Sequence, residues 1–486
     1  MAFKDLREFI DELEQRGLLK RITAEVDCEL EITEITDRVS KMEGEKNVAL
    51  LFENVKGYDM PVLMNAFGSM ERMAIALGVE KLDDVGDELR EILKLPYISL
   101  QHKTDLLSII PTAKRAINFP KYVKKAPCQE VVIEDEPTLD KFPILKCWPQ
   151  DGGRFITLPL VFTKNPETGK RNVGMYRLQK YDGQTTGMHW HIHKNGAENY
   201  RAYQAAGKDR IEVAVAIGTD PVLTYAATAP LPRDIDEMVF AGLLRHKSVE
   251  MVKCVSVDVE VPATSEIVLE GYVKTDELRR EGPFGDHTGY YSLADDYPVF
   301  HITCITHRKN PIYPATVVGK PPMEDCYLAK ATERIFLPFL QQMMPEIVDI
   351  NLPLEGVFHD CAMVSIKKSY PQQAKKVMQA IWGMGQMMFT KMIIVVDAHV
   401  NVQDTKEVWW RVFNNIDAKQ DLVMVEGPLD VLDHSSPMPK WGTKIGIDAT
   451  KSWPEEGHTR EWPDEITMSE DIRAMVDRKW KDLGLE

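Results

Sequence analysis

Three histidines at alternate positions, His189, His191 and His193, form the densest group of potential metal ligands in this sequence. If this segment is a strand, its side chains alternate between two faces, so all three imidazoles share one face. Asn172 adds an amide oxygen, and the Asp182-Gly183 turn predicts a hairpin that brings the two segments together. Nitrogen and oxygen ligands of this kind suit a divalent ion such as Mn²⁺. Alternating histidines are also common on a solvated strand face, so this segment alone leaves both interpretations open.

Glu237 is a further candidate ligand, because it stands at the start of a predicted helix that runs from Asp236 through Leu244. A carboxylate there would complete a set of amide, imidazole and carboxylate ligands and would neutralise a dication. The alternative is an exposed acid that the positive end of the helix dipole favours. The local pattern by itself favours that simpler alternative.

A loop with two acids, Glu281 and Asp286, predicts acid–base chemistry. Pro283 and the glycines of this loop favour an irregular turn, which can direct both carboxylates inward toward Arg177. Two carboxyl groups beside one arginine can have different pKa values, so that one stays ionised while the other holds a transferable proton. The same spacing also fits an ordinary surface turn with solvated acids.

A loop from Ser435 to Asp448 alternates glycine, proline and lysine. Its Lys444 could present an ammonium group to a phosphate. The loop matches neither a Walker loop nor a Rossmann turn. Taken alone, a surface loop is the simpler interpretation.

The residues around these candidates indicate domains of different architecture. Residues 1–115 begin with an amphipathic helix that closes near Gly17 and continue with short apolar strands, which predicts a small α/β domain. Residues 116–325 alternate apolar and polar side chains, most clearly at 254–261 and 299–306. This pattern predicts a mostly antiparallel sheet, which we expect to close as a barrel.

The last third of the chain has a different pattern. Residues 326–455 contain continuously apolar runs with helical stretches between them, which is typical of a parallel α/β sheet. Residues 456–486 form a tail whose helix is expected to begin after Ser469. One face of that helix is apolar and consists of Ile472, Met475, Val476, Trp480 and Leu483. Such a face needs a partner surface, so we expect it to pack on a neighbouring subunit, with docking on its own chain as the alternative.

The composition is that of a multidomain globular protein, with 486 residues of which 44% are hydrophobic. A formal net charge of −16 opposes binding to nucleic acid or anionic lipid. No apolar run predicts a transmembrane segment, and the N-terminal residues are charged where a secretory signal would be apolar. The seven cysteines are scattered without a paired motif, which predicts a reducing compartment. We therefore expect a cytoplasmic protein with a small-molecule substrate.

Several segments resemble the UbiD family, and they follow the order of that family along nearly the whole chain. The resemblance rests on Asn172-Val-Gly-Met-Tyr-Arg177, Phe240-Ala-Gly-Leu-Leu-Arg245, the stretch 259–272, Glu281-Gly-Pro-Phe-Gly-Asp286-His-Thr-Gly-Tyr-Tyr291, Pro345-Glu-Ile-Val-Asp349 and Lys444-Ile-Gly-Ile-Asp-Ala-Thr450. Such a set is far more specific than any one motif. It implies an α+β multidomain fold with an N-terminal α/β domain, a central split β-barrel that binds prenylated FMN, and a C-terminal α/β domain with a terminal helix.

The resemblance also implies the chemistry. Loss of CO₂ from an aromatic carbon would leave an unstabilised anion, so a cofactor has to bond to the substrate and accept the electrons. In the family prenylated FMN does this through a covalent adduct. Arg177, Glu281 and Asp286 match the family's catalytic residues: Arg177 would orient the carboxylate, Glu281 would tune the pair electrostatically, and Asp286 would return a proton to the carbon. Aspartate followed by His287 resembles the branch that acts on hydroxybenzoates.

Metal and cofactor contacts are implied in the same way. Asn172, His193 and Glu237 match the ligands of a Mn²⁺ that bridges to the flavin phosphate, with K⁺ close by, and His191 is the alternative to His193. The cofactor-binding positions are Asn172, Met175, Tyr176, Arg177, His189, Trp190, His191, Lys194, Asn195, Glu237 and Lys444. Some members carry arginine at the positions of His189 and Lys194.

The expected reaction is the reversible, non-oxidative decarboxylation of an aromatic acid. A polyprenyl hydroxybenzoate of ubiquinone synthesis and a small phenolic acid both fit. A UbiX-type flavin prenyltransferase would supply the cofactor, and a homodimer or homohexamer is expected. Two alternatives are a metal-dependent aromatic-acid enzyme without flavin and a non-catalytic subunit of a carboxylase complex. The intact Arg177, Glu281 and Asp286 argue against the latter.

Overall fold

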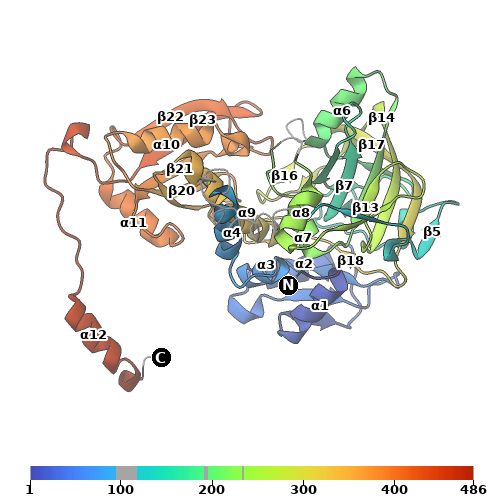
Figure 1. Cartoon of the computed structure of the whole chain (residues 1–486), viewed down its shortest axis with the longest axis horizontal. Helices are drawn as coiled ribbons and strands as arrows, with labels where there is room; N and C mark the ends of the chain where they lie inside the picture. The colour runs from blue at the N-terminus through green and yellow to red at the C-terminus, as the bar shows by residue number, and fades with distance from the viewer. Residues whose placement is uncertain (1, 95–117, 191–194, 233–234, 485–486) are drawn as a thin grey trace, which may run out of the picture.

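The computed structural model describes residues 2–94, 118–190, 195–232 and 235–484. Figure 1 shows an N-terminal group of elements (blue) beneath the central sheet (green to yellow), with the C-terminal sheet (orange) to one side. His191, His193, Lys194 and the side chain of Asn195 lie outside the described residues, so the roles predicted for them are not tested. In the described ranges, no helix has the length and apolar character that crossing a membrane requires.

An amphipathic helix opens the chain, as its periodicity predicts. α1 (Leu6–Gln15) begins after Asp5, whose carboxylate accepts hydrogen bonds from the first backbone N–H groups, and it ends before Gly17, which has a φ of +73°. The N-terminal domain contains α2 (Glu31–Ser40), α3 (Met70–Ala76), α4 (Leu82–Lys94) and a sheet of β1 (Leu19–Ile22), β2 (Ala49–Phe52), β3 (Val62–Met64) and β18 (Tyr313–Pro314). Since β18 follows the central sheet in the chain, the first two domains share a sheet.

The central domain is built on an antiparallel sheet with the hydrogen-bonded order β10-β17-β14-β11-β7-β8. Its strands are β7 (Pro159–Lys164), β8 (Arg171–Met175), β10 (Thr185–Gly187), β11 (Arg210–Ile217), β14 (Ile267–Glu281) and β17 (Asp295–His307), and β5 (Val131–Ile133) pairs with β17. All of these pairs are antiparallel. The mostly antiparallel sheet is therefore confirmed, and its closure as a barrel stays a prediction.

Residues 254–261 do not form the single strand that their alternation predicts. They lie in a hairpin between β12 (Glu250–Lys253) and β13 (Glu260–Pro262). The buried carboxylate of Glu270 accepts hydrogen bonds from the backbone N–H of Ser256 (2.6 Å) and of the residue before it (3.0 Å). Because these N–H groups bond a side chain, they are not available to a neighbouring strand, and the chain turns here.

The C-terminal domain is a five-stranded sheet that is parallel only at its centre. Its order is β19-β20-β21-β23-β22, with β19 (Ile347–Asn351), β20 (Cys361–Ile366), β21 (Met392–Asp397), β22 (Leu422–Pro428) and β23 (Trp441–Asp448). α10 (Gln373–Trp382) and α11 (Thr405–Asn415) lie where helices were predicted. β22 reaches β23 through a loop without a helix, and a direct connection of this kind gives an antiparallel pair. The parallel prediction, made from the apolar runs at 362–366, 392–396 and 422–425, is therefore right for β20 and β21 and wrong for β22, and it did not include β19 or β23.

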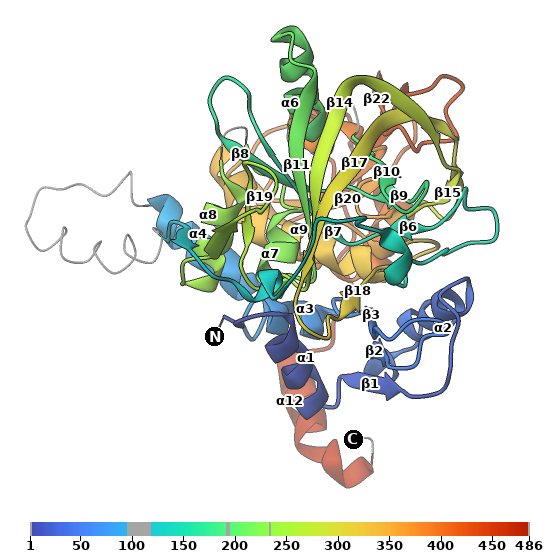
Figure 2. The ribbon, with the colours of Figure 1, turned by 90° about the vertical axis from the view of Figure 1, so that its right-hand side faces the viewer.

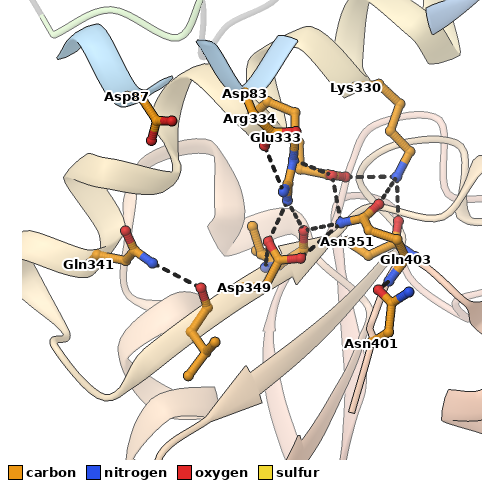
Figure 3. Close-up of polar contacts among 12 residues, drawn as sticks. Asp83, Asp87, Lys330, Glu333, Arg334, Gln341, Asp349, Asn351, Asn401 and Gln403 are labelled. Atoms are coloured by element: carbon orange, nitrogen blue, oxygen red, sulfur yellow. Dashed lines mark hydrogen bonds and ion pairs between the residues drawn. The ribbon is translucent and has the colours of Figure 1, made fainter. Parts of the chain in front are cut away.

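A buried polar network ties α9 (Glu324–Met343) to the domains on either side of it, as Figure 3 shows. Arg334 pairs with Asp83 of α4 (3.3 Å), with Asp349 of β19 (2.7 Å) and with its neighbour Glu333 (3.0 Å). One guanidinium therefore joins an N-terminal helix to the first strand of the C-terminal sheet. Through this contact α9 fixes how the C-terminal domain sits against the rest of the chain.

α12 (Glu470–Lys479) begins after Ser469, as predicted, and stands apart from the body of the chain in Figure 1; in the view of Figure 2 it extends downward behind α1. None of its residues is buried, and Trp480 and Leu483 are 47% and 57% exposed. Docking of this helix on its own chain is therefore not observed in the part that the structure describes, although residues 456–465 of the tail contact the C-terminal domain through Glu456 and Glu465. Packing on a neighbouring subunit stays a prediction.

Candidate active site

Arg177, Glu281 and Asp286 form one buried ion-pair cluster. Arg177 follows β8, Glu281 ends β14, and Asp286 follows β15 (Phe284–Gly285), which pairs with β16 (Tyr291–Ser292). Nε of Arg177 donates to Oε1 of Glu281 (3.0 Å), and Nη1 forms an ion pair with Oδ2 of Asp286. The three side chains are 10%, 0% and 8% exposed, respectively. The alternative interpretation of this loop as a solvated surface turn is therefore wrong.

Distant side chains hold the acidic loop in place. The N–H of Gly282 donates to the side chain of Gln179 (2.7 Å), and the N–H of Gly285 donates to Asp151 (2.8 Å). A Cβ at Gly285 would lie 2.1 Å from the ring of Trp148, so only glycine fits there. Sequence reasoning missed these positioning residues because they lie far along the chain from the glycines they contact and no motif marks them.

The charges of the cluster determine its ionisation. Burial would raise the pKa of Asp286, but Arg177 and His287 lower it well below its usual range. Burial would also raise the pKa of Glu281, which His189 and Arg177 lower below its ordinary value. Both acids are therefore carboxylates in the resting cluster. This differs from the expectation that one of them holds a transferable proton, because the single guanidinium lies close enough to stabilise both anions.

His189 contacts this cluster, although it does not lie on the predicted histidine strand. β10 ends at Gly187, and the N–H of His189 donates to the carbonyl of Arg177 (3.4 Å) from an irregular segment. Its Nδ1 lies 2.7 Å from Oε1 of Glu281, and its ring packs against Tyr297 at a centroid distance of 4.3 Å. Burial and the nearby guanidinium lower the pKa of His189. These two causes outweigh the charge of Glu281, which raises the pKa of His189.

A second polar pocket lies beside β8, around Asn172 and Glu237. Glu237 is the first residue of α8 (Glu237–Arg245), and its carboxylate accepts a hydrogen bond from the backbone N–H of Val173 (3.0 Å). Only 5% of Glu237 is exposed, and burial raises its pKa to about 7. The exposed-acid interpretation is therefore wrong, and the structure brings two of the three predicted metal ligands together.

Tyr176 connects this pocket to the segment that carries the third predicted ligand. Its buried hydroxyl accepts a hydrogen bond from the N–H of Gly196 (3.2 Å), in the first turn of α6 (Asn195–Ala205), and the nearby charge of Glu237 adds to the rise in its pKa that burial causes. His193 itself lies outside the described residues. In the described part of the chain, no three histidine, cysteine or acidic side chains lie close enough to hold a metal.

Three buried polar atoms on these segments have no hydrogen-bond partner among the described residues. They are Nδ2 of Asn172, Nε1 of Trp190 and Oε2 of Glu281. Buried polar groups are normally satisfied, so three of them on neighbouring segments indicate a site for a polar ligand. The residues present therefore fit the flavin that the resemblance implies.

The remaining described contacts predicted for the cofactor are Met175 and Lys444. Met175 ends β8 and is half-buried. Lys444 lies on β23, is only 2% exposed, and donates to the carbonyl of Met388, and burial lowers its pKa. It is therefore not on a surface loop, and its contact with a flavin phosphate stays a prediction.

A cavity of about 280 Å³ lies between the central and C-terminal domains. Trp190 and Tyr297 line it from the central domain, and Leu429 and Lys440 line it from the C-terminal domain. Because Tyr297 also packs on His189, the cavity adjoins the ion-pair cluster. Small-molecule sites often lie at domain interfaces of this kind.

Three domains of 3-octaprenyl-4-hydroxybenzoate carboxy-lyase match this chain in order. The N-terminal domain matches residues 10–90, the Rift-related domain matches residues 121–321, and the C-terminal domain matches residues 326–449. Together these matches cover most of the chain.

Whole-chain relatives agree with this assignment. An uncharacterized protein of Archaeoglobus fulgidus is 56% identical over 99% of both chains. The closed form of vanillic acid decarboxylase from Sedimentibacter hydroxybenzoicus has a TM-score of 0.85, with 30% identity over 100% of both chains. The UbiD-class enzyme HmfF from Pelotomaculum thermopropionicum, solved with FMN, has a TM-score of 0.82, with 30% identity over 97% of this chain and 99% of HmfF. The chain therefore belongs to the UbiD family of carboxy-lyases.

Proposed function

We propose that this protein catalyses the reversible, non-oxidative decarboxylation of a hydroxybenzoate-type aromatic acid with prenylated FMN as its cofactor. The observation that carries the proposal is the buried cluster of Arg177, Glu281 and Asp286 beside a cavity and beside partnerless polar atoms. The relatives support it, because one decarboxylates vanillic acid and HmfF was solved with FMN and, in an evolved dimeric form, with prenylated FMN. A polyprenyl hydroxybenzoate and a small phenolic acid are both consistent with this class.

The central domain would hold the cofactor. The contacts would come from 175–177 and 189–191, from Lys194 and Asn195, and from Lys444 of the C-terminal domain. Asn172, His193 and Glu237 would bind Mn²⁺, with K⁺ nearby. A divalent ion held there would compensate the buried carboxylate of Glu237 and would supply positive charge for the flavin phosphate, which an otherwise acidic protein needs to retain a dianionic group.

Bound prenylated FMN supplies an electron sink for the pair of electrons that the breaking C–C bond releases. Arg177 would bind and orient the substrate carboxylate through its Nη groups, of which Nη1 now pairs with Asp286 and Nη2 donates to Ser292, while its Nε is held by Glu281. The buried site favours the neutral product CO₂ over the charged carboxylate. After CO₂ leaves, a proton delivered from Asp286 replaces it on the same carbon.

The test is coexpression with a UbiX-type flavin prenyltransferase, followed by a screen of benzoic, hydroxybenzoic, naphthoic and cinnamic acids for CO₂ release. We expect a coloured protein that is active on hydroxybenzoates and nearly inactive when the prenyltransferase is omitted. Equal activity of colourless, flavin-free protein would instead support a metal-dependent enzyme. We expect the protein to work in the cytoplasm as a homodimer or homohexamer.

A further inference from the structure

A chain of hydrogen-bonding groups leads from Asp286 to the protein surface. Oδ1 of Asp286 lies 2.9 Å from Nδ1 of His287, whose Nε2 lies 2.8 Å from Nε2 of His359. Nδ1 of His359 lies 3.1 Å from Oδ1 of Asp360, within ion-pair distance, but it makes no hydrogen bond among the described residues. Each imidazole therefore uses one ring nitrogen toward the interior and the other toward the exterior.

Exposure rises steadily along this chain. The side chains of Asp286, His287, His359 and Asp360 are 8%, 16%, 18% and 35% exposed. The inner carboxylate is thus shielded from water while the outer one reaches it. A neutral imidazole can accept a proton at one nitrogen and release another from the opposite nitrogen, so two in series can carry a proton between these ends.

The loop before β20 is held in an unusual conformation that brings His359 to this position. Val357 and Phe358 have φ values of 41° and 56°, in the left-handed region that β-branched and bulky side chains avoid. The ring of Phe358 stacks on His287 at a centroid distance of 4.9 Å, and the N–H of His359 donates to the carbonyl of Val357 (2.9 Å). Strain of this kind persists where the surrounding structure enforces it, often at a functional site.

Acidic groups surround the inner imidazole. Burial would lower the pKa of His287, but Asp286 raises it, and Asp325 of α9 and Asp430 of the β22–β23 loop act in the same direction. Burial raises the pKa of Asp325 to about 6, while His287 opposes that rise. The surrounding acids therefore hold the pKa of His287 above its ordinary value, while Arg177 and His287 lower the pKa of Asp286.

We propose that His287 and His359 form a relay that carries a proton from Asp360 at the surface to Asp286. The proposal rests on the decarboxylase function proposed above, and it assigns positioning roles to two histidines that do not touch the substrate. It also gives Asp286, which is ionised at rest, a source for the proton that it would deliver.

The relay would replace the one proton that each turnover consumes. Decarboxylation breaks the C–C bond, releases CO₂ and leaves an electron pair that forms a new C–H bond with one proton. Each turnover therefore takes one proton from Asp286, and one proton from water has to replace it. It would pass to Nδ1 of His359, from Nε2 of His359 to Nε2 of His287, and from Nδ1 of His287 to Oδ1 of Asp286.

The decisive variant is His359→Gln in the cofactor-loaded protein. Glutamine places an amide near the position of Nε2 and preserves contact with His287, but it cannot pass a proton on. His434→Gln is the matched control, because His434 also belongs to the C-terminal domain and packs on the central domain, with its ring 4.0 Å from that of Tyr290. We expect kcat to fall about tenfold or more in His359→Gln, with KM within about twofold and a larger solvent deuterium isotope effect. The control should stay within about twofold of wild type.

A second measurement separates the relay from the proposed function. NMR of ¹⁵N-histidine-labelled, cofactor-free protein reports the tautomers and titration midpoints of His287 and His359 without any turnover. We expect His359→Gln to shift the midpoint of His287 and to fix its tautomer. If that midpoint and tautomer stay unchanged, or if His359→Gln keeps wild-type kcat and isotope effect, the relay is refuted. A wild-type protein that releases CO₂ from no aromatic acid, with coupled histidine titrations, would refute the proposed function alone.

Discussion

Replacement of Asp286 by asparagine should stop turnover while leaving the site assembled. The carboxylate makes two sets of contacts: Oδ2 pairs with Arg177, and Oδ1 accepts hydrogen bonds from the backbone N–H of His287 (2.8 Å) and lies 2.9 Å from its Nδ1. Asparagine has one acceptor oxygen, so it can keep the contacts with His287 but not the ion pair. Its amide cannot deliver a proton.

The size of each effect follows from what remains around Arg177. The guanidinium still donates to Glu281 (3.0 Å) and Ser292 (3.2 Å) and lies over the ring of Phe284 (4.4 Å), so it is not left without a counter-charge. We therefore expect Asp286→Asn to lower the free energy of unfolding by only about 1–3 kcal/mol, the value for one lost charged hydrogen bond. Loss of the proton donor should lower kcat about a hundredfold or more, which corresponds to about 2.7 kcal/mol in activation free energy.

The assay combines binding and chemistry. Flavin absorbance and calorimetric titration with the substrate should give occupancy and affinity within about twofold of wild type, and single turnover in D₂O should show slow CO₂ release. Asp286→Glu is the matched control, because it keeps the acid and should retain activity within about tenfold of wild type. If Asp286→Asn turns over within about threefold of wild type, with undiminished deuterium incorporation at the former carboxyl carbon, another acid is the donor. Glu281 would be the first to test.

Three further predictions concern the metal, the tail and pH. Glu237→Ala should lose Mn²⁺ and flavin together, as measured by elemental analysis and absorbance; wild-type flavin occupancy without metal would contradict the bridging role. A chain ending at Pro463 should form a smaller assembly in light scattering, and an unchanged mass would exclude the tail. The pKa of His287 is raised in the fold, so its stabilisation is complete below its unfolded pKa of about 6.5 and is lost as the pH rises through the folded value. In urea unfolding, His287→Gln should thus lose more stability at about pH 6 than at about pH 9, and an equal loss would contradict the pairing.

Local patterns predicted elements well where one physical cause dominates. The apolar face of α1 and its closing Gly17 determine that helix without help from distant residues. The prediction of a single strand at 254–261 was wrong because the alternation of side chains does not reveal a contact with another strand. That contact is the buried carboxylate of Glu270, which accepts hydrogen bonds from the backbone of this segment. The direction of β22 was predicted wrongly because an apolar run indicates burial but not strand direction.

The site was predicted better by residue identity than by local structure. For Glu237 and for the acids of the loop at 281–286, the local sequence also fitted a solvent-exposed side chain. Only the set of segments that resembles the family favoured buried, functional side chains. Their burial depends on β8 and on Arg177, which lie far away in sequence. No pattern in the sequence indicated that His359 contacts His287, because the two residues are 72 positions apart and belong to different domains.

An ionised Asp286 is compatible with its role as an acid, because Arg177 cannot serve two partners equally. In the resting protein the guanidinium is shared by Glu281 and Asp286, and this lowers the pKa of both acids. In the proposed mechanism, a substrate carboxylate bound at Nη1 would take the place of Asp286 at Arg177 and would add a second negative charge beside it. Both changes would raise the pKa of Asp286, whereas Glu281, on the Nε side, would keep its partner. The relay would then deliver a proton to Asp286 in the substrate complex, so the donor would be loaded in the state that needs it.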